Sequence, residues 1–162
     1  MAERYQPQSE FLRAVVAEQC RLSGDEFADA NLRLLIEMMR DQDPSNRDWA
    51  TFLLAQQDLD GSEIRDALLE ATSDSFENVR AEAIWGLARR DPELALPFVR
   101  SALSADTAQM PVFEAAILCA DPSLIGDLRE WTEPSENSFL DKIALDALTA
   151  CEEAASQRRT DA

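Results

Sequence analysis

Apolar residues recur every three to four positions along most of the chain, with polar residues between them. This is the spacing of amphipathic helices, because 3.6 residues make one helical turn. The clearest example is the segment 74–87, where Val79, Ala83 and Leu87 lie at intervals of four. Glycine is rare, with only 4 residues, which also favours helices. The chain is therefore predicted to be all-α.

Start and stop signals divide the chain into about nine helices in antiparallel pairs. Ser9 and Asp25 stand where the first two helices begin, and Pro44 prevents the second from continuing. Further start signals stand at 61–62, 91–92 and 121–122. The last predicted helix covers 135–155.

The helices are expected to form a single domain over residues 1–155, a length that can bury its own core. Residues 1–42 are predicted to be two N-terminal cap helices, which cover the open end of a stacked core. Residues 43–132 carry the repeats, and 135–155 form the C-terminal helix. The polar tail 156–162 is expected to fray.

Two of the predicted units repeat with a period of 33 residues. The same offset pairs three sets of positions: Arg47 with Arg80, Ala50 with Ala83, and Leu54 with Leu87. A period of this length is typical of stacked helical pairs. A third unit around Val112 and Phe113 is weaker, because Glu114 stands near the place of the expected basic residue.

The repeated positions resemble HEAT repeats, in the short bacterial form also found in relatives of phycobilisome lyases. The pattern has an Asp at a turn, then Val-Arg, then Ala, then an Ala/Gly-Leu pair. It is matched in full by Asp74, Val79, Arg80, Ala83, Gly86 and Leu87. It is matched in part by Asp43, Arg47 and Ala50, with Asn46 where Val belongs. The resemblance covers roughly residues 25 to 150 and implies an α-α superhelix.

These positions are expected to be structural. The small Ala83 and Gly86 allow close approach of the paired helix, and Val79 and Leu87 fill the seam. Asp74 can cap its helix, a contribution of about 1 kcal/mol. The resemblance implies that the recurrent Asp and Arg tie one repeat's turn to the next.

The net charge of -17 disfavours binding to nucleic acid or to an anionic membrane. It suits either a basic partner or simply a well-solvated surface. Residues 106–162 carry 12 acids and 4 bases, the most acidic third of the chain. The N-terminus lacks the apolar core of a signal peptide, and no apolar run reaches membrane-spanning length, so a cytoplasmic protein is expected.

Signals for an enzyme are lacking in the sequence. It contains no His, which excludes the usual catalytic triads and His-metal sites. Its four glycines are isolated and form no phosphate-binding loop. Cys20, Cys119 and Cys151 lie in helical patterns and are interpreted as buried structural thiols. No catalytic residue, metal ligand or cofactor is expected.

Three arginines are candidate partner-binding residues. Arg65, Arg100 and Arg129 share a register on the second helices of the units, which line the concave face in this architecture. They could form a basic column for a carboxylate-rich segment, or they could simply make local helix pairs, such as Arg129 with Glu133.

The aromatic residues Phe52, Trp85, Trp49 and Trp131 could be binding anchors, but at helical spacing they are more often inter-repeat core. The preferred hypothesis for function is a non-catalytic protein-interaction scaffold, monomeric and with a protein partner. One alternative is an accessory subunit of a lyase-like or chaperone-like modifying enzyme. Another is an acidic inhibitor or immunity-type protein that covers a basic surface.

Overall fold

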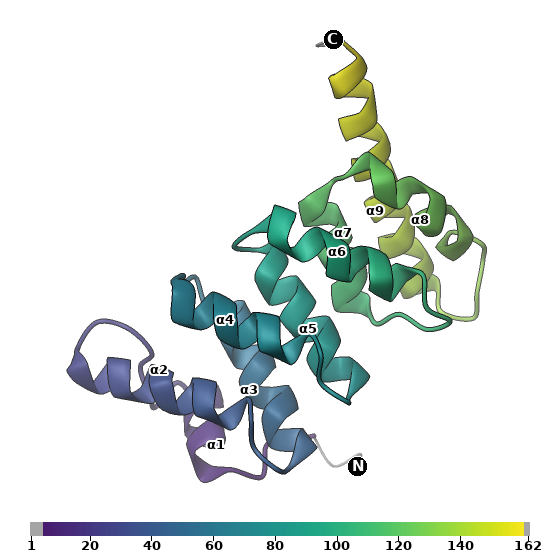
Figure 1. The fold of residues 1–162 in the computed structure, drawn as a ribbon. Coiled ribbons are helices and arrows are strands. Elements are labelled where there is room, and N and C mark those ends of the chain that lie inside the picture. The colour runs from purple at the N-terminus through teal and green to yellow at the C-terminus, as the bar shows by residue number, and fades with distance from the viewer. Residues whose placement is uncertain (1–4, 161–162) are drawn as a thin grey trace. The chain divides into compact units, whose positions relative to one another are not determined.

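The structure is a computed structural model that describes residues 5–160, and every regular element in that range is helical (Figure 1). The elements are α1 (Glu10–Val16), α2 (Glu26–Met38), α3 (Pro44–Gln56), α4 (Ser62–Ala71), α5 (Glu77–Ala88), α6 (Pro92–Leu103), α7 (Met110–Cys119), the 3-10 turn η1 (Pro122–Leu124), α8 (Ile125–Trp131) and α9 (Ser138–Thr160). The all-α prediction and the expected nine helices are confirmed for the described residues.

The contacts divide the chain into two compact units, one through Ala83 and the other from Ile84. The helix α5 begins in the first unit and ends in the second. The prediction of one domain over 1–155 therefore stays a prediction, and each unit is described by itself.

In the first unit α3 is the central helix, packed against α1, α2 and α4. Its side chains and those of its neighbours form a core whose largest members are fully buried: Leu12, Leu35, Leu54, Leu68 and Val79. Helix starts follow the predicted caps, because the side chains of Ser9, Asp25 and Asp43 each accept a hydrogen bond from a first-turn N–H.

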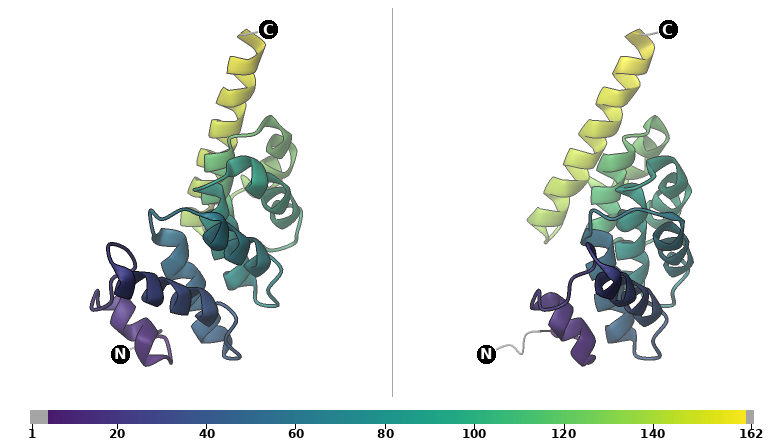
Figure 2. Two further views of the ribbon diagram at one scale, coloured as in Figure 1. Left: turned by 60° about the vertical axis from the view of Figure 1, so that its left-hand side comes forward. Right: turned by 90° about the vertical axis from the view of Figure 1, so that its left-hand side faces the viewer.

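In the second unit α9 packs along α7 and α8, and α7 packs against α6 (Figure 2). The core of this unit includes Val99, Phe113, Leu124, Leu128 and Cys151, all fully buried. The ring of Phe113 meets that of Trp131 edge to face, with centroids 5.4 Å apart.

Two helix boundaries differ from the prediction. Helical spacing of apolar residues continues from Phe11 to Leu22 and predicts one helix over that stretch, but α1 ends at Val16, because Glu18 adopts a left-handed conformation with a φ of 56°. The last helix begins at Ser138, where Asn137 caps it by accepting a hydrogen bond from the Leu140 N–H. It continues through residue 160, into the segment expected to fray, and 161–162 lie outside the described residues.

Candidate functional site

The apolar and small residues of the repeat pattern are used in packing. Ala50, Val79, Ala83 and Leu87 have no exposed surface, and Gly86 is buried as well. Residues without accessible surface cannot contact a partner. Their predicted structural role agrees with this burial.

Arg47 and Asp74 form an ion pair between the helix α3 and the turn before α5. Arg47 Nε lies 2.7 Å from one carboxylate oxygen and Nη2 lies 3.1 Å from the other. The side chains are only 14% and 11% exposed. Burial works to raise the pKa of Asp74, but hydrogen bonds from Arg47 and from the Phe76 N–H outweigh it and leave this pKa below its ordinary value. The Arg links one repeat to the turn of the next, as the resemblance implied.

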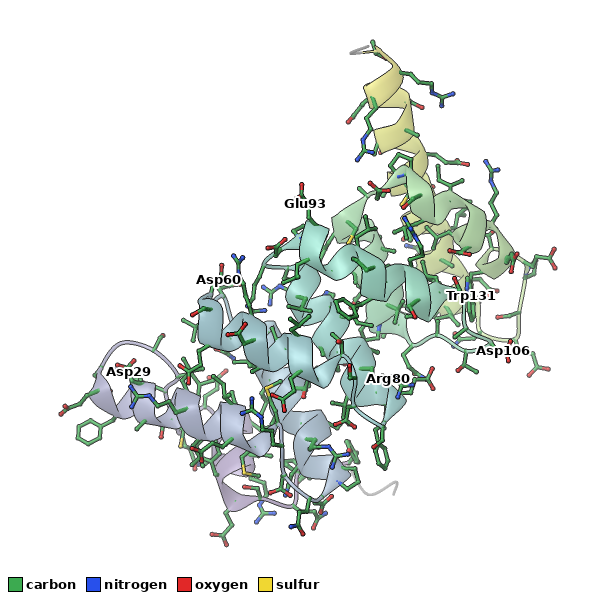
Figure 3. The ribbon with its side chains drawn as sticks, in the orientation of Figure 1. Asp29, Asp60, Arg80, Glu93, Asp106 and Trp131 are labelled. Carbon is green, nitrogen blue, oxygen red and sulfur yellow. The ribbon has the colours of Figure 1, made fainter. Side chains whose placement is uncertain are left out.

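Three arginines, here called the turn-closing arginines, each donate from Nη1 to the two carbonyls six and five residues back. The contacts are Arg13 to Pro7 (3.0 Å) and Gln8 (2.9 Å), Arg47 to Asp41 (2.9 Å) and Gln42 (3.3 Å), and Arg80 to Asp74 (2.8 Å) and Ser75 (3.0 Å). Figure 3 labels Arg80 on α5. Each arginine fastens the turn before its own helix by satisfying carbonyls that no helix uses.

Sequence reasoning missed Arg13, which lies 34 rather than 33 residues before Arg47. The residues around it carry neither the Asp nor the small positions of the repeat pattern. The available signal was an Arg one residue outside the expected offset. The first helix therefore has a turn-closing arginine, as the repeats do.

The counterpart of Asp74 in the preceding repeat is Asp41, and the alignment on Asp43 needs correction. Asp74 accepts a hydrogen bond from the N–H two residues on, and Asp41 does the same from the Asp43 N–H, each at 2.8 Å. Asp43 instead caps α3 by accepting from the Ser45 N–H. The offset from Asp41 to Asp74 is 74 − 41 = 33, the period of the arginines.

Asn46, which replaces the Val of the pattern, is buried and makes polar contacts. Its Oδ1 accepts a hydrogen bond from the Ser9 N–H at 2.9 Å, and its Nδ2 donates to Asp41 at 3.4 Å. This side chain joins the start of α1 to α3, and both its oxygen and its nitrogen have hydrogen-bond partners although it is buried. The departure from the pattern thus has a local structural use.

The candidate arginines are each held by a group of their own unit. The contacts are Arg65 to Asp60 (2.8 and 2.7 Å), Arg100 to Ser123 Oγ (2.5 Å) and Arg129 to Glu152 (3.1 Å). Arg65 belongs to the first unit and the other two to the second. Arg129 pairs with α9 rather than with Glu133 of its own segment. A basic column made of these three residues stays a prediction.

Most of the candidate aromatic residues have packing partners. Trp131 Nε1 donates to the Leu103 carbonyl at 2.8 Å, so both its ring and its N–H are fixed. Trp49 stacks on Tyr5 and meets Phe52 edge to face, with both centroid distances 5.7 Å. The rings therefore contribute to packing within each unit.

Burial raises the pKa of both Cys119 and Cys151 to about 11, so neither is an activated thiolate. Within residues 5–160, His, Cys, Asp and Glu form no group of three or more placed to hold a metal ion. Over the same range no helix is both long and apolar enough to cross a membrane.

Comparison with known proteins agrees with this arrangement. A sequence model described as HEAT repeats matches residues 32–120. Protein YibA of Escherichia coli, in strains K12 and O157:H7, is 31% identical over 119 residues, which cover 74% of this chain and 42% of YibA. The X-ray structure of YibA superposes with a TM-score of 0.60 and 26% identity, covering 85% of this chain and 54% of that one. The chain thus spans less than half the length of these curated relatives.

Proposed function

Because the chain belongs to the HEAT-repeat family, we propose that it is a non-catalytic scaffold that binds a protein partner through its exposed helical surface. Proteins of this family generally mediate protein–protein interaction, and the predicted resemblance is confirmed for residues 32–120. The proposal places the scaffold in the cytoplasm and gives it no cofactor.

The observation that carries the proposal is a set of large apolar side chains that remain on the surface of a protein with a net charge of -17. They include Phe27 (74% exposed), Phe76 (50%), Met110 (40%), Leu118 (43%), Phe139 (64%) and Leu145 (53%). Aromatic and methionine side chains are the groups that interfaces favour, whereas lysine and glutamate are depleted there. The repeat residues themselves are used in packing and turn closure, so the surface is left for binding.

A second candidate function is an acidic inhibitor that covers a basic surface of another protein. The charge distribution favours it, since residues 106–162 have a net charge of 4 − 12 = −8. The two functions differ in their dependence on salt. Binding through charge weakens steeply with ionic strength, because the Debye length falls from about 10 Å at 0.1 M to about 3 Å at 1 M.

The experiment is affinity capture from the native cell with the full chain as bait, at about 0.1 M and about 0.5 M salt, followed by mass spectrometry. The captured protein is then purified and titrated against the bait, which separates direct binding from carry-over. The scaffold function predicts a direct complex that survives at the higher salt. Loss of the complex at high salt favours the inhibitor, and failure of every captured protein to bind directly contradicts both.

The candidate arginines are part of this proposal, and a triple charge reversal tests them. The triple variant carries Arg65→Glu, Arg100→Glu and Arg129→Glu. It should bind a partner that carries carboxylates at least about tenfold more weakly than wild type does. Arg33, an exposed arginine of α2, provides the control Arg33→Glu. Unchanged partner binding by a folded triple variant excludes the basic column.

A further inference from the structure

An open hollow of about 430 Å³ lies on the second unit, between the loop before α7 and the start of α9. We call it the Trp131 hollow, and its lining residues come from segments 106–110 and 137–140 together with Trp131. Figure 3 labels two of them, Asp106 and Trp131, close together on one side of this unit. The volume lies within the range of ligand pockets, roughly 300–1,000 Å³.

The walls of the Trp131 hollow are held in place before any partner arrives. Trp131 is fixed by its hydrogen bond to the Leu103 carbonyl and by the ring of Phe113. The turn that leads into α9 is held as well, because the Ser135 N–H and hydroxyl both donate to Asp141, at 2.9 and 2.6 Å. A preorganised wall lowers the entropic cost of binding.

The lining combines apolar surface with an exposed rim. Met110 is 40% exposed and Phe139 is 64% exposed, although both are large apolar side chains. Trp131 is half-buried and presents part of its ring to the same space. A side chain that enters the hollow can therefore remove three apolar surfaces from water at once.

The charged residue in the lining is the acidic Asp106, and the segments that supply the lining are acidic as well. Segments 104–110 and 130–141 contain Asp106, Glu130, Glu133, Glu136 and Asp141 and no Lys or Arg. The basic residues that flank the second segment are engaged elsewhere, since Arg129 pairs with Glu152 and Lys142 with Asp146 at 2.8 Å. An apolar site inside an acidic rim is complementary to an apolar side chain between cationic ones.

We propose that the Trp131 hollow is the subsite that receives one large apolar side chain of the partner, flanked in the partner's sequence by lysine or arginine. This inference rests on the proposed scaffold function and specifies the chemistry of the segment it binds. The aromatic rings of Trp131 and Phe139 add cation–π attraction for the flanking charges.

The test uses a fluorescent peptide with a central leucine between two pairs of arginine and lysine, titrated with the full chain. Phe139→Ala and Asp106→Lys should each weaken binding by about tenfold, as loss of an anchor or a rim charge does. Phe139 and Asp106 are both exposed, so these variants retain the fold, which circular dichroism verifies. A peptide with serine in place of the leucine should bind at least about tenfold more weakly.

Two control variants separate the hollow from the general charge. Glu93→Lys changes the net charge as much as Asp106→Lys, but Glu93 lies near the start of α6, a helix about 18 Å long, whereas Asp106 follows its end (Figure 3). Leu94→Ala removes an exposed apolar residue of α6 that does not line the hollow. Both should change binding less than about twofold. Equal binding of the serine peptide, or equal loss in Glu93→Lys and Asp106→Lys, overturns the proposal.

The same variants separate this inference from the scaffold function. A double variant combines Asp106→Lys with Phe139→Ala. If a purified partner binds it as well as it binds wild type, the proposed role of the hollow is overturned, whereas the proposed scaffold function stands. A hollow that binds the leucine peptide selectively, with no cellular protein forming a direct complex, supports the subsite chemistry and contradicts the scaffold.

Discussion

Arg47 of one repeat forms a bidentate ion pair with Asp74 of the next, with nitrogen–oxygen distances of 2.7 and 3.1 Å, and both side chains are largely buried. The same guanidinium closes its own turn through Nη1. One side chain thus performs both the local and the inter-repeat role. A single substitution of Arg47 therefore removes both contacts at once.

Arg47→Ala should lower the free energy of unfolding by about 2 kcal/mol, because it leaves the covered carboxylate of Asp74 without its cation and two carbonyls without a donor. Denaturant unfolding followed by circular dichroism measures the change. The matched control is Arg40→Ala, which breaks a pair with Glu70 whose side chains are 52% and 59% exposed. That variant should lose less than about 1 kcal/mol, and equal losses contradict the interpretation.

Stability should fall in acid as Asp74 is protonated. The pKa of Asp74 is lowered in the folded protein, so its contribution is complete above the ordinary value of 3.8 and is lost as the pH falls through the folded value. Asp74→Asn should therefore lose stability at pH 7 and show a shallower decline below pH 3.8. Unfolding in urea at pH 7, 4 and 3 measures both, and parallel declines in the two proteins contradict it.

One carboxyl acts in the opposite sense. Burial raises the pKa of Asp48, which accepts a hydrogen bond from the Tyr5 hydroxyl at 3.0 Å. Its contribution is present below the ordinary value and is lost as the pH rises through the folded value. Asp48→Asn should therefore remove the loss of stability that occurs as the pH rises above 3.8. Asp74→Asn alters the curve of stability against pH below 3.8, so the same urea titrations distinguish the two carboxyls.

Arg13→Ala should loosen α1 with a smaller effect on the rest of the first unit. It frees the carbonyls of Pro7 and Gln8, which lie just before that helix. Amide hydrogen exchange in α1 should become about tenfold faster, equivalent to about 1.4 kcal/mol of local stability. Arg33→Ala, on the exposed face of α2, is the control and should leave exchange in α1 unchanged.

The thiols should differ in reactivity. With a pKa of about 11, Cys119 and Cys151 hold only about one thiolate in a thousand at pH 8, so an aromatic disulfide reagent should modify them slowly. Cys20 lies outside the helices and is half-buried, so it should react first. Cys20→Ser should remove the fast phase, and a fast phase that persists contradicts the assignment.

The two units should unfold in one transition, because the continuous helix α5 belongs to both. Variants that keep only Trp49 or only Trp131 report on the first and second units separately, with Phe at the other tryptophan positions. Their fluorescence midpoints in denaturant should coincide with the midpoint from circular dichroism. Separate midpoints contradict the prediction of a single domain over 1–155.

The helices and the repeat could be predicted because caps, prolines and the offset of 33 are local properties of the sequence. The register of the turn could not, since Asp41 and Asp43 both precede the same helix and only their hydrogen bonds distinguish them. Likewise, the early end of α1 depends on the left-handed conformation of Glu18. A left-handed position is usually predicted from a glycine, and the residue here is a glutamate.

The candidate site was the least predictable part. The three arginines were chosen for a shared register, but sequence does not reveal that Arg129 reaches across to Glu152 on α9. The Trp131 hollow joins Met110 and Phe139, which are 139 − 110 = 29 residues apart, follow different turns and share no pattern. Only the packing of α7, α8 and α9 brings them together.

The turn-closing arginines have a consequence for how such a chain can change its length. Each takes its carbonyl partners from the few residues immediately before it, so a duplicated stretch of 33 residues brings a complete turn with it. A whole repeat can be gained by duplication or lost by deletion of its coding sequence, and every remaining turn keeps its arginine contacts. Of the contacts that these arginines make, the one between Arg47 and Asp74 reaches the next repeat and has to find a new neighbour, which an acidic residue at one position can supply.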